Sequence, residues 1–448
     1  MARHPGGRRV GGACQADRPM SEAVPRSGGT GSRVAWLTVA LLVPVALLNY
    51  LDRQLVATMQ RSIIGDVSGI ESQEQWGHML AWFKWTYAFA SPFAGLVADR
   101  FSKPLIVCSS LFAWSAVTWA TGHATTYDHL LATRAAMGLA EAFYIPTALA
   151  LIADHHASAT RSRAVGIHQI GIYLGVMLGS LGGFVADSPA LGWRWGFTTI
   201  GLVGVIYAIP LFLLLRPPSG LARSGAMERP HESPLATATT LLSNPSFLLL
   251  LTYFTLPAIA GWVIRDWMPS VLQKELNLTQ GIAGVSAVIW WQAAAIVSAI
   301  GGGWLADRWM HRTDRGRIYV SAIGMAAIVP ALLGVGIVLD TKSLLLAVLF
   351  LMLFGVGWGL FDTNNMPILS QIVRPEQRAA GYGLMNLASI SFGGIADVGF
   401  GWLRDQQVPL PLIFGGFAGI ACLSAWLVLC IQPAGRRGGD GEIGSPPE

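Results

Sequence analysis

The chain has 448 residues, of which 53% are hydrophobic and 12% are charged, and its formal net charge is +5. Soluble domains hold about 25% charged residues, so this composition excludes an ordinary soluble protein and indicates a helical membrane protein. A transmembrane β-barrel would show shorter alternating segments instead of long apolar runs. The arginines lie in polar segments beside the apolar runs, so membrane orientation explains the positive charge better than nucleic-acid binding does.

Enzyme motifs are missing from the sequence. There is no His-Glu-x-x-His motif, and no Gly-Lys pair that a phosphate-binding loop would need. The four cysteines, at positions 14, 108, 422 and 430, lack the spacing of a metal site or a disulfide framework. We therefore expect no enzymatic activity, no cofactor and no metal.

In chain order, residues 1–32 and 433–448 are polar and rich in glycine, and we expect both to be disordered cytoplasmic tails. The segment 216–246 holds prolines at 217, 218, 230 and 234 among polar residues and is predicted to be a cytoplasmic linker. It separates an N-terminal six-helix bundle, 33–215, from a C-terminal six-helix bundle, 247–432. Apolar runs predict twelve membrane spans, at about 34–59, 76–99, 104–122, 129–154, 163–187, 193–215, 247–272, 279–305, 316–338, 343–371, 378–404 and 410–432.

The distribution of arginine and lysine sets the expected orientation. If the N-terminus is cytoplasmic, most of these residues fall in the tails, the linker and the loops on the cytoplasmic side. The protein is therefore predicted to be a multi-pass protein of the plasma (inner) membrane, with both termini in the cytoplasm.

A ten-residue motif occurs once in each half of the chain. The first copy, at 95–104, reads GLVADRFSKP, and the second, at 303–312, reads GWLADRWMHR. Each copy follows one apolar run and precedes another, so each is expected to form a tight charged turn between two helices. The halves also match at Glu141 and Asp362, each of which precedes a proline by five residues. Parallel six-helix repeats are typical of transporters whose substrate site lies between the halves.

The doubled motif and the six-plus-six layout resemble the major facilitator superfamily over about residues 34–432. Within that superfamily, the segment NYLDRQ at 49–54 is similar to the anion:cation symporter family, which includes sugar-acid carriers, and DWMP at 266–269 resembles the organophosphate:phosphate antiporters. One departure is Phe-Ser at 101–102, where the family usually has a glycine. The resemblance implies an all-α fold of 12 transmembrane helices in two pseudo-symmetric bundles. It also implies gating by the motif residues Gly95, Asp99, Arg100, Asp307 and Arg308.

Several ionisable side chains lie inside the apolar runs, where a charge costs several kcal/mol unless it meets a partner or a wet cavity. Asp52 and Arg53 lie in the outer half of the first span, and Lys84 lies at a similar depth in the second. Arg134 and Glu141 are seven residues apart in the fourth span, so they share one face of the helix.

Two interpretations stay open for most of these groups. Either Asp52 and Arg53 form a local ion pair that holds the first helix to a neighbour, or Arg53 binds an anionic substrate while Asp52 takes up a proton. Glu141 is either a proton carrier or the structural partner of Arg134. For Lys84 a functional role is favoured, because a structural lysine needs a buried partner and has a flexible stem to hold in place.

The predicted site combines these groups with polar and aromatic residues at matching depth in both halves. Residues predicted to bind substrate are Tyr50, Arg53, Lys84, Arg134, Tyr144, Trp291, Gln292, Asn364, Asn365 and Asn386. Residues predicted to couple protons are Asp52, Glu141 and Asp362.

The four cations at Arg53, Lys84, Arg134 and Arg265 favour an anionic substrate. We expect a secondary active transporter that works by alternating access and takes up a small organic anion, such as a sugar acid, with protons or sodium. The alternative is efflux or exchange of an amphipathic lipid, a drug or an organophosphate by the same fold. Expected partners are the small-molecule substrate, the coupling ion and the lipid bilayer, without nucleic acid, and the protein is expected to be a monomer. A receptor that binds without translocation would usually add a large soluble domain.

Overall fold

The computed structural model describes residues 29–217 and 234–433. Within these ranges the regular structure is helical, apart from an isolated bridge between Ser68 and Thr126. The predicted tails lie almost wholly outside the described residues, as does much of the predicted linker. The described part of the linker contains a short helix, α11 (Pro234–Leu242).

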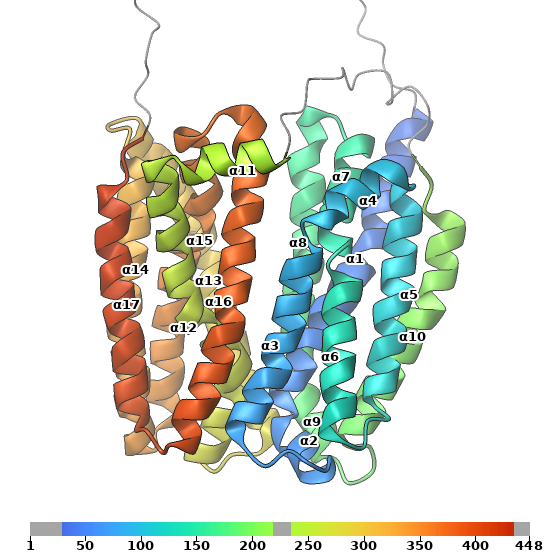
Figure 1. The fold of residues 1–448 in the computed structure, drawn as a ribbon, viewed down its shortest axis with the longest axis vertical. Helices are drawn as coiled ribbons and strands as arrows, with labels where there is room; N and C mark the ends of the chain where they lie inside the picture. Colours follow the sequence, from blue (N-terminus) through green and yellow to red (C-terminus); the bar gives the residue numbers. More distant parts are fainter. Residues whose placement is uncertain (1–28, 218–233, 434–448) are drawn as a thin grey trace, which may run out of the picture.

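The helices form two bundles that follow each other in the sequence (Figure 1). The N-terminal bundle consists of α1 (Gly29–Thr58), α2 (Gln60–Asp66), α3 (Gln73–Ala90), α4 (Phe93–Arg100), α5 (Lys103–Thr121), α6 (Tyr127–Glu141), α7 (Tyr144–His155), α8 (Ser158–Gly179), α9 (Gly182–Asp187) and α10 (Gly192–Leu214). The C-terminal bundle consists of α12 (Pro245–Glu275), α13 (Gln280–Met310), α14 (Gly316–Val338), α15 (Leu344–Ile372), α16 (Arg378–Asp405) and α17 (Leu410–Cys430), with short 3-10 turns at Leu339–Thr341 and Pro375–Gln377.

Eleven helical segments in the described ranges are long and apolar enough to cross a membrane. The remaining predicted span, at 76–99, is present as α3 and α4, which are separated by a break at Ser91 and Pro92. The sequence of α3 includes Lys84 and the polar stretch Gln-Glu-Gln at its start, and these residues lower its hydropathy. It nevertheless packs inside the molecule, against α6 and α16. All twelve predicted spans are therefore present as helices.

Polar side chains define where several of these helices begin. The hydroxyl oxygens of Thr126, Thr279 and Ser343 each accept a hydrogen bond from a backbone N–H in the first turn of α6, α13 and α15. Ser72 forms a capping box with Gln75 at the start of α3. Each of these residues satisfies an N–H group that the helix itself leaves without a partner.

Glycines allow close approach of helices within each bundle. A Cβ atom on Gly171, Gly175 or Gly179 of α8 would lie 2.6, 2.3 or 2.7 Å from a backbone carbonyl oxygen of α1. In the C-terminal bundle, Gly355 and Gly359 of α15 approach the backbone of α13 in the same way, at 2.2 and 2.3 Å. Small residues permit such tight contacts between membrane helices, and here the contacts hold each bundle together.

The end of the molecule that carries α11 is called the linker end, and the opposite end the far end (Figure 1). At the far end, Asp405 of α16 accepts hydrogen bonds from the backbone N–H groups of Gln73 and Glu74, at 2.9 and 2.8 Å. Asp187 of α9 accepts one from the backbone N–H of Gly281, at 3.0 Å. Each carboxylate faces the positive N-terminal end of a helix from the other bundle, which is a favourable arrangement. These two caps are equivalent under the pseudo-symmetry of the repeats, and they join the bundles at the far end.

Candidate functional site

Lys84 connects the two bundles near their centre. Its ammonium group forms ion pairs with the Oδ2 atoms of Asp266 on α12 and Asp397 on α16. The whole side chain of Lys84 is only 2% exposed, and Asp397 is fully buried. The ammonium also lies 4.6 Å from the centre of the Trp262 ring. This lysine therefore has the buried partners that its depth requires, and both partners come from the opposite bundle.

Arg53 pairs with Glu141 inside the N-terminal bundle. Arg53 Nε donates a hydrogen bond of 2.6 Å to Glu141 Oε2, and the carboxylate is fully buried. The rings of Tyr50, Phe83 and Tyr87 each lie 4.9 Å from the guanidinium carbon of Arg53. Aromatic faces stabilise a guanidinium that is removed from water. The predicted structural partner of Glu141 was Arg134, but the ion pair that Glu141 forms is with Arg53.

Asp52 faces a different set of groups from its neighbour Arg53. It accepts a hydrogen bond from the hydroxyl of Thr118, and Asp52 Oδ1 lies 4.0 Å from Arg134 Nη2. The same Nη2 donates to the Thr121 hydroxyl at 3.3 Å. Asp52 and Arg53 therefore do not pair with each other, because consecutive side chains leave the helix in different directions. Each instead pairs with a residue of α6, so both hold the first helix to a neighbour, as one of the two interpretations expects.

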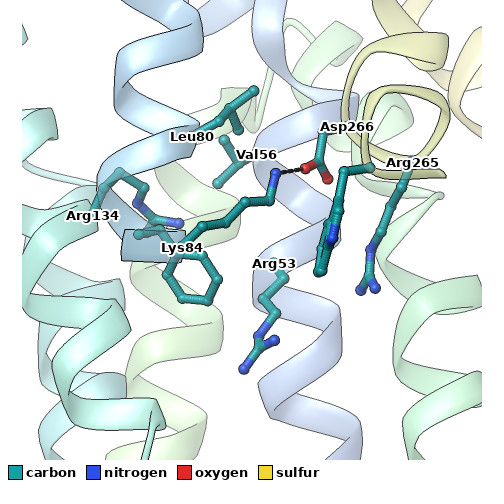
Figure 2. Close-up of a pocket in the computed structure, with 9 residues that line it drawn as sticks. Arg53, Val56, Leu80, Lys84, Arg134, Arg265 and Asp266 are labelled. Carbon is teal, nitrogen blue, oxygen red and sulfur yellow. Dashed lines mark hydrogen bonds and ion pairs between the residues drawn. The ribbon is translucent and has the colours of Figure 1, made fainter. Parts of the chain in front are cut away.

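A small cavity lies between these groups, and Figure 2 shows Arg53, Lys84, Arg134, Arg265 and Asp266 around it. Its volume is about 30 Å³, enough for a water molecule or two but too small for a sugar acid. Three guanidinium nitrogens of lining residues are buried without a hydrogen-bond partner: Arg53 Nη2, Arg134 Nε and Arg265 Nη2. The cavity thus offers N–H donors from both bundles to an acceptor that enters it.

Arg265 differs from the other three cations. Its guanidinium carbon lies 5.4 Å from the ring centre of Tyr50 and 5.5 Å from that of Trp262. In the part of the chain that the structure describes, it forms no ion pair with a carboxylate within 4.0 Å, and its Nη2 atom has no hydrogen-bond partner. Its charge is therefore available to a bound anion.

Asp362 lies away from this cluster, on the exposed part of α15. Its charge acts on Tyr173 of the N-terminal bundle and on Tyr253 and Tyr382 of its own bundle, and Asn365 acts on the Asp362 carboxylate. Asp362 therefore faces the boundary between the bundles. Asn386, on α16, is partly exposed.

Other predicted substrate residues are not among those that line the cavity. Tyr144 is fully buried within the N-terminal bundle, where its hydroxyl donates to the carbonyl of Leu42. Trp291 packs edge-on against Phe354 in the C-terminal bundle, and Gln292 beside it is partly buried. The remaining pair, in α15, is also buried. Asn364 donates to the carbonyl of Leu360 at 2.9 Å, whereas the amide of Asn365 makes no hydrogen bond of ordinary geometry and acts on the nearby carboxylate of Asp362.

The predicted gating residues lie in helices, and not in tight turns as expected. Gly95, Asp99 and Arg100 belong to α4, and Asp307 and Arg308 belong to the last turns of α13, so only the end of each motif copy leaves the helix. The structure does not describe the side chain of Asp99 or the burial of Gly95. Arg100 is exposed at the end of α4. In the second copy, Asp307 lies 3.6 Å from Arg317 of the next helix, and Arg308 lies over the Trp304 ring at 5.8 Å. Gating by these residues stays a prediction.

Sequence reasoning missed Asp397, which is the more deeply buried of the two partners of Lys84. The signal that could have identified it was present, because an acidic residue within an apolar run is by itself a candidate functional group. Asp187 and Asp405 were also missed, since their position at the ends of spans made them look like ordinary surface residues.

Two bundles of membrane-crossing helices, joined by buried ion pairs at their boundary, define a non-enzymatic membrane carrier. The sequence matches the Major Facilitator Superfamily over residues 42–397, and the chain belongs to this superfamily. Among solved structures, it is similar to a bacterial homologue of the human lysosomal transporter Spinster in an inward-facing, unoccupied conformation. That match has a TM-score of 0.71 and 20% identity, and it covers 89% of this chain and 95% of the other. A mutant of the nucleoside transporter NupG matches with a TM-score of 0.69 and 14% identity, over 88% of this chain and 99% of that one.

Two similar sequences carry different names. An MFS-type efflux pump of Mycolicibacterium smegmatis is 27% identical over 387 residues, covering 84% of this chain and 86% of the pump. Protein spinster homolog 1 of Bos taurus is 31% identical over 271 residues, covering 57% of this chain and about half, 49%, of the relative. The predicted superfamily is confirmed. The resemblance to anion:cation symporters stays a prediction, because these relatives carry other names.

Proposed function

We propose that the protein is a proton-coupled secondary transporter that takes up a small organic anion, such as a sugar acid, by alternating access. The observation that carries this proposal is the meeting of Arg265 with unpartnered N–H groups of Arg53 and Arg134 at one cavity between the bundles. A carboxylate or phosphate group suits such donors, because a planar guanidinium matches its oxygens in a two-pronged contact.

Charge balance links the anion to a proton. The buried cluster holds four cations, at Arg53, Lys84, Arg134 and Arg265, and four carboxylates, at Asp52, Glu141, Asp266 and Asp397. It is therefore formally neutral before substrate enters. A bound anion would leave one uncompensated negative charge away from water, which is costly. Protonation of Glu141 removes this excess and frees Arg53 to bind the substrate, so proton uptake at Glu141 accompanies uptake of the anion. Asp52 and Asp362 are further candidate proton carriers.

The far-end contacts and the small cavity support a cycle in which the bundles 33–215 and 247–432 rock against each other. With both termini and the linker 216–246 in the cytoplasm, the structure corresponds to a form closed on the outside. Because the cavity holds only water-sized molecules, substrate entry requires the bundles to shift. We place the protein in the plasma (inner) membrane as a monomer, with sodium as the alternative coupling ion.

The test is uptake into proteoliposomes that contain the purified protein. A panel of sugar acids, phosphorylated compounds and neutral sugars is compared with and without an imposed pH gradient. Anions should accumulate only with the gradient, and Arg265→Gln should abolish their uptake while Arg265→Lys retains part of it. Transport of neutral compounds alone, or anion uptake that ignores the gradient, would refute the proposal.

A second candidate function is efflux or exchange of an amphipathic compound. It is favoured by the apolar residues that line the same cavity, namely Val56, Leu80, Phe83 and Trp262, and by the relative that is named an efflux pump. In that case the apolar part of the substrate provides most of the binding energy. Arg265→Gln would then reduce transport of lipids or dyes only slightly, which distinguishes the two functions in the same assay.

A further inference from the structure

The carboxylates of Asp266 and Asp397 form a pair within the C-terminal bundle. They come from α12 and α16, and both contact the single ammonium of Lys84 through their Oδ2 atoms. Asp397 Oδ1 is buried and accepts no hydrogen bond of ordinary geometry, although the indole N–H of Trp267 acts on this carboxylate. Two carboxylates that share one ammonium lie close to each other, so each depends on Lys84 to offset the repulsion of the other.

Few charged groups act on the carboxylates of Asp266 and Asp397. Within the described chain, the charged groups that act on Asp397 are Lys84 and Asp266. Arg265 also acts on Asp266, but its guanidinium lies over the Tyr50 and Trp262 rings and donates no hydrogen bond to either carboxylate. Arg53 and Arg134 line the adjoining cavity and are held by Glu141 and Asp52 in the N-terminal bundle. Lys84 is therefore the direct counter-ion of the pair.

Alternating access must separate these groups, because Lys84 belongs to the N-terminal bundle and both aspartates belong to the other. When the far end opens, the ammonium moves away with its bundle and leaves two neighbouring carboxylates. Two carboxylates that share a site do not readily ionise together, so one of them takes up a proton.

We propose that Asp266 and Asp397 form a second proton site, loaded from the far side and emptied by Lys84. On opening, a proton from far-side water forms an O–H bond with one of the two carboxylates. On closing, the ammonium of Lys84, which stays protonated throughout, takes its place between the carboxylates. The displaced proton passes from the carboxyl O–H to a water molecule in the cavity that Asp266 lines, and from there to water on the linker side. The site rests on alternating access and proton coupling, and it is separate from the Arg53–Glu141 pair.

The test measures the distance between the bundles at the far end as a function of pH, without substrate. Full-length protein that lacks the native cysteines is labelled with spin probes at Glu71→Cys and Gln406→Cys, two exposed far-end positions in different bundles. It is reconstituted in lipid nanodiscs and studied by double electron–electron resonance. Because only the open form binds the extra proton, the ratio of open to closed molecules should rise on acidification, by up to about tenfold per pH unit.

Two aspartates of the same helix provide a matched comparison. Asp397→Asn leaves a single carboxylate for Lys84, so the rise on acidification should disappear. Asp405→Asn weakens an exposed cap at the far end. It should shift the ratio of open to closed molecules by the same factor at every pH, so the slope of this ratio against pH stays that of the wild type. Asp266→Asn should also abolish the slope, and it replaces Asp397→Asn if that variant does not fold.

The proposal is overturned if Asp397→Asn keeps the wild-type slope, if opening increases as the pH rises, or if the ratio follows sodium at fixed pH. Since no substrate is present, a negative result here is distinct from failure of the uptake assay.

Discussion

Gly77 provides a direct test of how the bundles close at the far end. A Cβ atom at this position of α3 would lie 2.5 Å from the carbonyl oxygen of Asp397 and 2.9 Å from the Cα of Val398. Both are backbone atoms, so no side chain can rotate to make room. Gly77→Ala therefore forces α3 and α16 apart by several tenths of an ångström in the closed form, whereas the open form leaves space for the methyl group.

The magnitude follows from the cost of overpacking, which is about 1–3 kcal/mol. Because only the closed form bears this cost, the ratio of open to closed molecules should rise by about 5- to 150-fold. The assay is the far-end distance measurement with spin probes at Glu71→Cys and Gln406→Cys.

Gly175→Ala is the matched control for Gly77→Ala. Its Cβ would lie 2.3 Å from the carbonyl oxygen of Leu47, a contact within the N-terminal bundle. Gly175→Ala strains both forms equally, so it should lower the melting temperature without changing the far-end distance. An unchanged distance distribution in Gly77→Ala, with a folded protein, would refute the closure described here.

Three further predictions concern charged pairs at different depths. Arg53→Gln leaves the buried Glu141 without its partner and should destabilise the protein by about 3–5 kcal/mol. The double variant Arg53→Gln/Glu141→Gln should recover most of the lost melting temperature, yet it should remain inactive in the uptake assay. Asp307→Asn should change stability by at most about 1 kcal/mol in thermal unfolding, because Asp307 is 74% exposed and its pair with Arg317 is solvated. Asp187→Asn removes a negative charge from the start of α13 and should favour the open form by about 0.3–1 kcal/mol; an unchanged far-end distance would contradict this.

Much of the fold could be predicted from the sequence, because the membrane restricts the possible structures. Long apolar runs must form helices in lipid, where every backbone N–H and C=O needs a partner within its own segment. The repeated motif at 95–104 and 303–312 and the polar segment at 216–246 indicated two halves. Local breaks were not predicted, such as the one at Ser91 and Pro92 between α3 and α4. Such breaks depend on packing against neighbouring helices.

The candidate site was predicted in its residue types but not in its pairings. Lys84, Arg53 and Glu141 were recognised because a charged side chain in an apolar run stands out without any alignment. Their partners were not: Glu141 contacts Arg53, and Lys84 contacts Asp266 and Asp397. An expected excess of positive charge became a formally neutral cluster once Asp397 and Asp266 were included.

The sequence by itself determined the class of the protein, the number of spans and the depth of each ionisable group along its helix. Depth follows from the rise per residue, which is nearly constant in any α-helix. Only the tertiary structure decided which groups meet, because that depends on how each helix is rotated and on which helices are neighbours. Asp266 of α12 and Asp397 of α16 both contact the ammonium of Lys84 in α3, although the three residues are far apart in the chain. Burial away from water makes such contacts necessary, and helix packing decides which carboxylates provide them.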